Sequence, residues 1–310
     1  MERQQNERNK TLNNKLNRIS WPTNIGFNVI LLFFALACFL PFIVVFPISI
    51  TDEASIAANG YQLFPSAFSS QAYKFLWAER DQILAALGMS VIVTMLGTAL
   101  GVMLTTVLGY AMSRPDYKLK GFLTGMVFIP MIFNGGMVAS YVINMQLLQF
   151  RNGLHALILP LMVSSFNVVI SKTFFRTTIP DSIVESAKID GASQLRIYFK
   201  IVLPISKPVL ATLALFLSFG YWNDWFLSML YISNPKMYTL QYLLQQIVMN
   251  VEFLAKNPGV GASLQDYIKS MPRESVRMAI AVLIVLPIAL AYPFFQKYFV
   301  SGLTIGAVKG

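Results

Sequence analysis

Long apolar segments alternate with shorter polar segments along almost the whole chain. Five stretches contain no Asp, Glu, Lys or Arg: residues 19–51, 82–113, 121–150, 152–171 and 278–296. A sixth, at 208–232, is interrupted only by Asp224. About 20 apolar residues are enough for a helix to cross the hydrocarbon core of a bilayer. The pattern therefore predicts an all-α integral membrane protein with six transmembrane helices.

The six predicted spans have recognisable internal features. We expect them at 27–50, 83–112, 122–143, 154–175, 208–231 and 276–299. Pro41 and Pro47 should kink the first span, since membrane helices tolerate proline. In the second span, Gly97 and Gly101 form a face of small residues that lets another helix approach closely. The sequence FNGGM at 133–137 predicts a weak point in the third span.

Charge sets the predicted orientation. The chain is 55% hydrophobic and only 12% charged, with a formal net charge of +10. If the N-terminus is cytoplasmic, 16 of the 24 Lys and Arg residues lie in inside segments and 7 in outside segments. Basic residues concentrate on the cytoplasmic side of membrane proteins. We therefore expect both termini inside, and the positive charge gives no reason to invoke nucleic acid.

The spans divide the chain into regions. These are a cytoplasmic N-terminal segment (1–26), the six-helix transmembrane domain (27–300, core 83–300, inner loop 176–207, outer loop 232–275) and a cytoplasmic tail (301–310). In the outer loop, apolar residues at helical spacing from Leu240 to Leu254 predict an amphipathic helix, followed by a flexible tip at 254–264. Such a helix can contact an extracytoplasmic partner or rest on the membrane surface, and the pattern supports both.

The inner loop contains ESAKIDGASQLRIYFKIVLP at 185–204. Its charged and apolar residues predict two short helices joined by a turn at Gly191. A pair of helices of this size cannot bury its own apolar residues. It therefore needs another surface, either the helix ends of the same chain or a cytosolic partner.

This loop resembles a motif of the membrane subunits of binding-protein-dependent ABC importers. Their pattern is E-A-A, three residues, G, nine residues, I-x-L-P. The chain has Glu185-Ser186-Ala187, Gly191 and 201–204 at the same spacing, with Ser186 in place of the usual Ala. Further resemblance to the carbohydrate-uptake branch, and within it to the maltose-type second permease and an oligosaccharide sub-branch, lies at 58–61, 133–137, 189–193, 200–212, 222–223 and 302–310.

The resemblance implies a type I ABC importer permease fold in the cytoplasmic (inner) membrane. It implies alternating-access sugar transport with a second, different permease chain, two ATPase subunits and an extracytoplasmic solute-binding protein. Residues implied in coupling to the ATPase are Glu185, Ser186, Ala187, Asp190, Gly191, Ile201, Leu203 and Pro204. Glu185 would meet a basic residue of the ATPase, and Lys309 would lie in a tail between the ATPases.

The chain carries no chemistry of its own for ATP hydrolysis. It lacks a Gly-x4-Gly-Lys-Ser/Thr phosphate loop, so ATP and Mg would be bound by the partner ATPases. His155 has no spaced metal-ligand partner, so we expect no metal site and no cofactor in this chain. The single cysteine, Cys38, lies in the first span and should be buried or face lipid.

Polar residues within the spans are candidates for the substrate path. Asp224 lies between two tryptophans in GYWNDWF, and aromatic faces beside polar groups suit sugar rings. Alternatively, Asp224 orders a helix end at the outer interface, with the tryptophans in the interfacial belt. The candidates are Asn134, Asn167, Trp222, Asn223 and Asp224. Asn134 and Asn167 could equally bond neighbouring helices.

Other functions fit less well. An ABC permease for another small solute stays open. A stand-alone secondary transporter favours inverted repeats and ionisable residues for ion coupling, whereas the spans contain one Asp. A membrane-embedded enzyme needs a nucleophile with its base or a metal cluster, and the chain has one His and one Cys.

Overall fold

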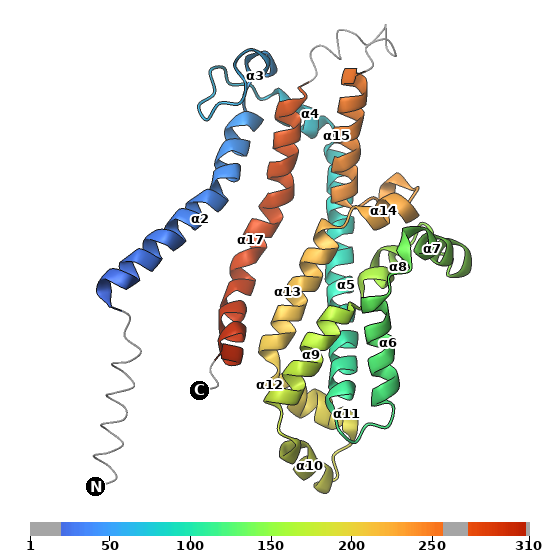
Figure 1. Ribbon diagram of the computed structural model, residues 1–310. Helices are drawn as coiled ribbons and strands as arrows, with labels where there is room; N and C mark the ends of the chain where they lie inside the picture. Colours follow the sequence, from blue (N-terminus) through green and yellow to red (C-terminus); the bar gives the residue numbers. More distant parts are fainter. Residues whose placement is uncertain (1–19, 257–271, 308–310) are drawn as a thin grey trace.

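The computed structural model describes residues 20–256 and 272–307 (Figure 1). Within these ranges the regular structure is helical, apart from one isolated antiparallel bridge between Thr51 and Phe68. Two helices are each long and apolar enough to cross a membrane, and two bent pairs of helices meet the same criterion if each pair is counted as one span. The all-α membrane fold predicted from the sequence is confirmed.

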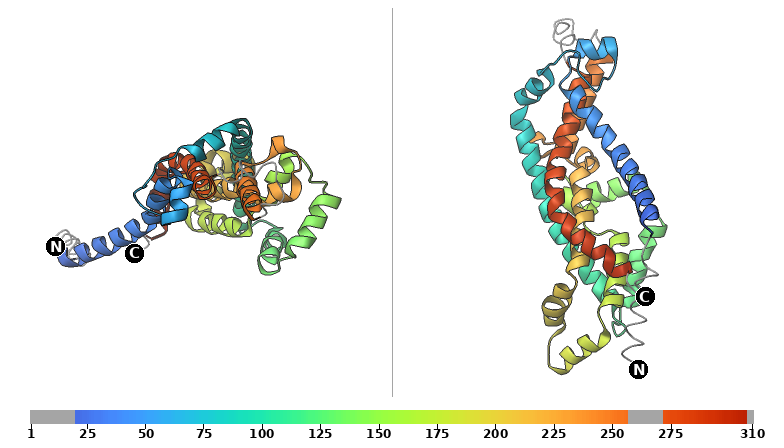
Figure 2. Two further views of the ribbon diagram at one scale, coloured as in Figure 1. Left: turned by 90° about the horizontal axis from the view of Figure 1, so that it is seen from above. Right: turned by 90° about the vertical axis from the view of Figure 1, so that its left-hand side faces the viewer.

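The first span, α2 (Trp21–Ser49), diverges from the other helices. Its side chains are exposed over most of its length, and the view from above shows it extending away from the bundle (Figure 2). Pro41 and Pro47 lie inside it, as expected. Cys38 is exposed on this helix. An apolar helix left uncovered by its own chain needs lipid or another membrane subunit around it.

Two short helices, α3 (Glu53–Asn59) and α4 (Gln71–Ala78), follow α2 at one end of the molecule (Figure 1). They lead into α5 (Arg80–Ser113), whose 34 residues form a rod about 51 Å long at 1.5 Å per residue. This helix packs along both α9 (Ser165–Thr178) and α13 (Lys207–Asn223), so it is the axis of the bundle.

Glycines let neighbouring helices approach α5 closely. A Cβ placed on Gly97 would overlap the ring of Tyr221, and one on Gly101 would lie 2.8 Å from the backbone oxygen of Met162. The predicted small-residue face at these two positions is therefore confirmed. Gly109 extends it, because a Cβ there would collide with Ser171 of α9.

Three of the predicted spans are broken. The third ends α6 (Lys120–Ile132) before Phe133 and resumes as α7 (Gly136–Val142) and a π-turn (Ile143–Leu147), with Gly136 at φ 81°, which confirms the weak point predicted there. The fourth consists of α8 (Leu154–Ile158), a 3-10 turn (Leu159–Leu161) and α9, bent by 53°. The fifth consists of α13 and α14 (Phe226–Tyr231).

The prediction that 154–175 and 208–231 each form one continuous helix is therefore wrong. At the break between α13 and α14, a carboxylate oxygen of Asp224 accepts a hydrogen bond from the backbone N–H of Leu227 at 3.2 Å and caps α14. The backbone oxygen of Asp224 also accepts a bond from the Thr239 hydroxyl at 3.3 Å. These contacts replace bonds that a continuous helix would make within itself.

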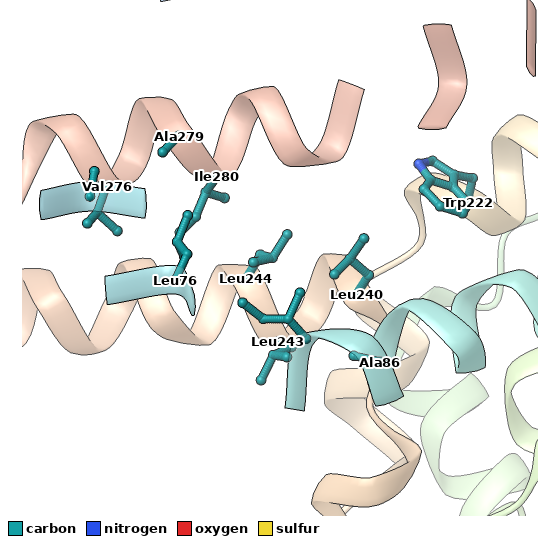
Figure 3. Close-up of a cluster of buried hydrophobic side chains, with 11 residues drawn as sticks. Leu76, Ala86, Trp222, Leu240, Leu243, Leu244, Val276, Ala279 and Ile280 are labelled. Carbon is teal, nitrogen blue, oxygen red and sulfur yellow. The ribbon is translucent and has the colours of Figure 1, made fainter. Parts of the chain in front are cut away.

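The outer segment contains a short 3-10 turn (Pro235–Met237) and then α15 (Leu240–Lys256), which confirms the predicted amphipathic helix. Figure 3 shows its apolar side chains, Leu240, Leu243 and Leu244, facing residues of α4, α5 and α17 (Glu274–Ala307). The face of α15 that carries these leucines is therefore covered by the protein itself, whereas Met249 and Phe253 of the same helix are exposed. The predicted tip lies in large part outside the described residues.

The arrangement of the helix ends agrees with the predicted orientation. The start of α2, the end of α17, and the two short helices of the inner loop lie toward the same end of the molecule (Figure 1). At the opposite end, Glu53 of α3 accepts hydrogen bonds from the backbone N–H groups of Glu274 and Ser275 at 3.0 and 3.3 Å. This carboxylate caps α17, which continues to Ala307.

Candidate functional site

The inner loop forms the predicted pair of helices. The first is α10 (Asp181–Ile189), and Gly191 after it adopts φ 76°, the left-handed region that favours glycine. The backbone N–H of Ala192 bonds the oxygen of Ala187 at 2.9 Å, and that of Gly191 bonds Lys188 at 3.0 Å. These two bonds define a Schellman motif, so the turn at Gly191 has a specific physical cause.

The second helix begins at a capped residue and ends in a sharp bend. Ser193 accepts a bond from the backbone N–H of Arg196 at 3.3 Å and caps α11 (Gln194–Ile197). A π-turn (Tyr198–Val202) and α12 (Leu203–Ile205) continue it, and an 83° bend then leads into α13. Pro204, which has no backbone N–H to donate, lies beside this bend. Ile201 and Leu203 are half-buried, and Pro204 is exposed.

The helix α10 has one covered face and one free face. Val184 and Ala187 are buried in a cluster with residues of α5, α9 and the second helix. Glu185, Ser186 and Asp190 are exposed. The tip of the loop also exposes two large apolar side chains, Ile189 at 86% and Leu195 at 71%. The ends of the long helices therefore cover one face of the inner loop and leave the other face exposed.

Two residues of the turn between α5 and α6, neither of them predicted from the sequence, hold the covered face of α10. Pro115 disfavours helical geometry at the preceding residue, so Arg114 is extended and α5 ends at Ser113. Arg114 is buried, and its guanidinium donates to Asp181 at 2.8 Å and to the backbone oxygen of Phe175 at 3.2 Å.

The second contact joins Asp116 to Lys188 at 2.5 Å. The hydrogen bond donated by Lys188 lowers the pKa of Asp116 below its ordinary value and raises that of Lys188. The only signal in the sequence was a charged turn, SRPDYKLKG, between two spans. Pairing it with residues of the inner loop, far away in the chain, required the fold.

The substrate-path candidates do not form one site. Asn134 is exposed at the break between α6 and α7, where its oxygen accepts a bond from the N–H of Gly136 at 2.9 Å. It lines a cavity of about 590 Å³ with Ser140, Asn144 and Tyr231 among others. Asn144 donates to the Tyr231 hydroxyl at 3.0 Å. This cavity therefore combines amide groups with an aromatic ring.

Asn167 is buried in α9 and lines a second cavity, of about 300 Å³, with Phe166, Phe216 and Tyr221. Leu161 of the 3-10 turn lines both cavities, so the two cavities are neighbours.

The GYWNDWF residues have local roles. Trp222 is buried in the apolar cluster of α4, α5, α15 and α17 (Figure 3). Asn223 donates to the backbone oxygen of Phe219 at 3.0 Å, and Asp224 caps α14. These contacts match the alternative in which Asp224 orders a helix end. They place Trp222 in the core rather than at an interface.

His155 is exposed and packs edge-on against Phe150, and the part of the chain that the structure describes holds no group of three metal-ligating side chains. Lys309 lies outside the described residues.

Comparison with known proteins gives consistent matches. Residues 16–305 match the family described as binding-protein-dependent transport system inner membrane component. The chain is 36% identical to protein LplC of Bacillus subtilis over 87% of this chain and 89% of that protein. It is 37% identical to the polygalacturonan/rhamnogalacturonan transport system permease protein YtcP of Bacillus subtilis, over 90% and 96%.

A solved structure agrees in fold. It is that of a bacterial ABC transporter involved in the import of the acidic polysaccharide alginate. One of its chains is 26% identical to this one with a TM-score of 0.75, covering 91% of this chain and 99% of that chain.

Proposed function

The chain belongs to the family of inner-membrane components of binding-protein-dependent transport systems, and we propose that it is the permease subunit through which a partner ATPase drives oligosaccharide import. Its relatives include permeases of oligosaccharide transport systems, so sugar import across the cytoplasmic membrane is the function of the branch. The chain works with another permease, an ATPase and a binding protein. We propose a different second permease chain, two ATPase subunits that bind ATP and Mg, and no catalytic role for this chain.

The observation that carries the proposal is the half-covered pair of helices at the cytoplasmic end. Its inner face is packed on the helix ends, while Glu185, Ile189 and Leu195 remain exposed. Apolar side chains exposed beside a carboxylate, outside the membrane, indicate a protein partner rather than lipid. The pair also runs directly into α13, so a force on it reaches a membrane span.

The proposed mechanism is rigid-body coupling. When the ATPase subunits close on nucleotide, they displace α10 and α11, and Glu185 meets a basic residue of the ATPase. Gly191 fixes the turn between the two helices. Leu203 and Pro204 join the second helix to α13 at the 83° bend, so the displacement moves α13. Alternating exposure of the central path follows. The tail residue Lys309 would add a second contact with the ATPases.

The cavity at the break in the third span is the proposed sugar contact within this chain. Its lining combines the amides of Asn134 and Asn144 with Phe226 and Tyr231. Sugar rings pack on aromatic faces and bond amides through their hydroxyls, and binding pockets typically combine apolar walls with a few polar groups. Asn167, which lines the neighbouring cavity, would contact the sugar farther along the path.

Three candidates receive a supporting role instead. Trp222, Asn223 and Asp224 stabilise the junction of α13 and α14 through the contacts described above. They shape the walls of the path rather than bind the sugar. Replacing Asn134 should therefore affect sugar transport more directly than replacing Asn223.

Reconstitution tests the proposed function. Proteoliposomes containing both permeases, the ATPase and the binding protein should take up labelled oligogalacturonides or neutral oligosaccharides only with ATP inside. Vesicles containing this chain without the ATPase should take up nothing, even under a proton or sodium gradient. Gradient-driven uptake by the chain alone would instead show a secondary transporter and contradict the proposal.

A further inference from the structure

We propose that the turn between α5 and α6 is a second mechanical link from the ATPase to the transmembrane domain, with Arg114 and Asp116 as positioning residues that make α5 move together with α10. The inference rests on the proposed function, because it assumes that an ATPase displaces α10. It adds a route that does not pass through the bend at Pro204.

The link holds α10 at both ends. Arg114 pairs with Asp181, the first residue of α10, at 2.8 Å, and Asp116 pairs with Lys188 near its end at 2.5 Å. These two partners are seven residues apart, about 10 Å along a helix axis. A helix fixed at two such points cannot pivot about either one.

The order of the charges permits only one direction of docking. The turn presents a cation and then an anion, while α10 presents Asp181 and then Lys188. If α10 lay in the opposite direction, Arg114 would face Lys188, and Asp116 would face Asp181. Like charges would then oppose each other at both ends. The pairs therefore specify how α10 lies on the turn, in addition to holding it there.

Arg114 also connects the ends of two helices. Its guanidinium binds the Phe175 backbone oxygen in the last turn of α9 and the Asp181 carboxylate in the first turn of α10. A cation at a helix C-terminus and an anion at a helix N-terminus are both favoured by the helix dipole. The guanidinium lies over the Tyr110 ring, 5.2 Å from its centre. Only arginine has the planar group with several donors that serves all these contacts.

The helix that receives the force reaches the other end of the molecule. Near the outer end of α5, Ser90 accepts a hydrogen bond from the backbone N–H of Leu240 at 2.8 Å. Ile83 and Ala86 of α5 pack in the same cluster as Leu243 of α15. A displacement of α10 transmitted to α5 is thus delivered to α15, the outer helix.

A third contact has the same effect. The Thr106 hydroxyl of α5 lies 2.7 Å from the Tyr198 hydroxyl of the second helix, and both groups are buried. The inner loop therefore contacts α5 and the turn after it at three places, through Asp181, Lys188 and Tyr198. By contrast, the inner loop joins α13 only at the 83° bend.

Charge exchange tests the link in the assembled complex. The variants are Asp116→Lys, Lys188→Asp and the double exchange, with Lys118→Asp as a control that changes charge in the same turn. All carry Cys38→Ser, plus Ser182→Cys on α10 and Met103→Cys on α5 for spin labels. The distance between the labels is measured without nucleotide and after trapping with ATP and vanadate.

The parent, the double exchange and the control should keep the same distance in both states. Each single variant should change distance on trapping, because α10 then moves without α5. A change in the parent, or no change in either single variant, would overturn the proposal. Transport per ATP hydrolysed should fall at least about fivefold in the single variants, the lower end of typical coupling between sites. It should recover in the double exchange.

A covalent link provides an independent test. Asp116→Cys with Lys188→Cys should lower transport per ATP, and a short bismaleimide joining the two introduced thiols should restore it. Failure of the bridge to restore transport would contradict joint movement. If Glu185→Lys also left transport unaffected, the proposed coupling through α10 would fail together with the link. If Glu185→Lys stopped transport while Asp116→Lys did not, only the link would fail.

Discussion

Replacing Glu185 by lysine should reduce transport, and the stimulation of ATP hydrolysis by the loaded binding protein, by at least about tenfold, within the usual range for coupling between sites. Glu185 lies on the exposed face of α10, so the substitution leaves the buried cluster beneath intact. It places a positive charge where we propose that the ATPase presents a basic residue, and like charges oppose docking. Membrane insertion and the amount of folded protein should not change.

The control is Asp81→Lys, which makes the same change of charge on an exposed acidic residue at the outer end of α5. It should leave ATP hydrolysis coupled to transport. Both variants are compared in proteoliposomes by sugar uptake and phosphate release. Transport by Glu185→Lys at the rate of the unmodified protein would remove α10 from the mechanism.

Replacing Gly97 by leucine should prevent α5 and α13 from packing. A Cβ at this position already overlaps the Tyr221 ring, so a larger side chain displaces that ring. The Tyr221 hydroxyl donates a buried hydrogen bond to the backbone oxygen of Ile158 at 2.7 Å, and this bond would be lost as well. Overpacking of a core costs about 1–3 kcal/mol and occasionally more, and an unpaired buried acceptor adds about 1–3 kcal/mol.

Gly88 provides a matched control in the same helix, since a Cβ there meets nothing within 4 Å. Thermal unfolding of the purified proteins, monitored by size-exclusion chromatography after heating, should show a lower midpoint temperature for Gly97→Leu than for Gly88→Leu. Equal midpoints would mean that α5 and α13 are not packed through this glycine face.

Local patterns in the sequence predict local features of this fold. Six apolar stretches, the turn at Gly191 and the apolar side of α15 all depend on residues close together in the chain. The weak point at 133–137 could be predicted for the same reason, because adjacent glycines act on their own backbone. The E-A-A spacing identified the inner loop before any contact was known.

Features that depend on distant partners could not be predicted. The break at Asp224 is stabilised in part by Thr239, and the end of α5 at Arg114 acquires its role from Asp181. Trp222 is another example. Its neighbours in sequence suggest a sugar site. Its position on α13, however, buries its side chain among the apolar residues of α15 and α17. The hydrophobic pattern of a sequence shows which residues are apolar, but it does not show which other parts of the protein cover them.

Cross-linking at the tip of the inner loop tests the central claim most directly. Ile189, the most exposed apolar residue of α10, is replaced by cysteine in a Cys38→Ser background, and Gln245→Cys on α15 serves as the control. In membranes containing the assembled importer, a bifunctional thiol reagent should join the Ile189→Cys variant to the ATPase subunit, and the Gln245→Cys variant should form no such product. A loop that never cross-links to the ATPase, although both are present in one complex, would contradict the account.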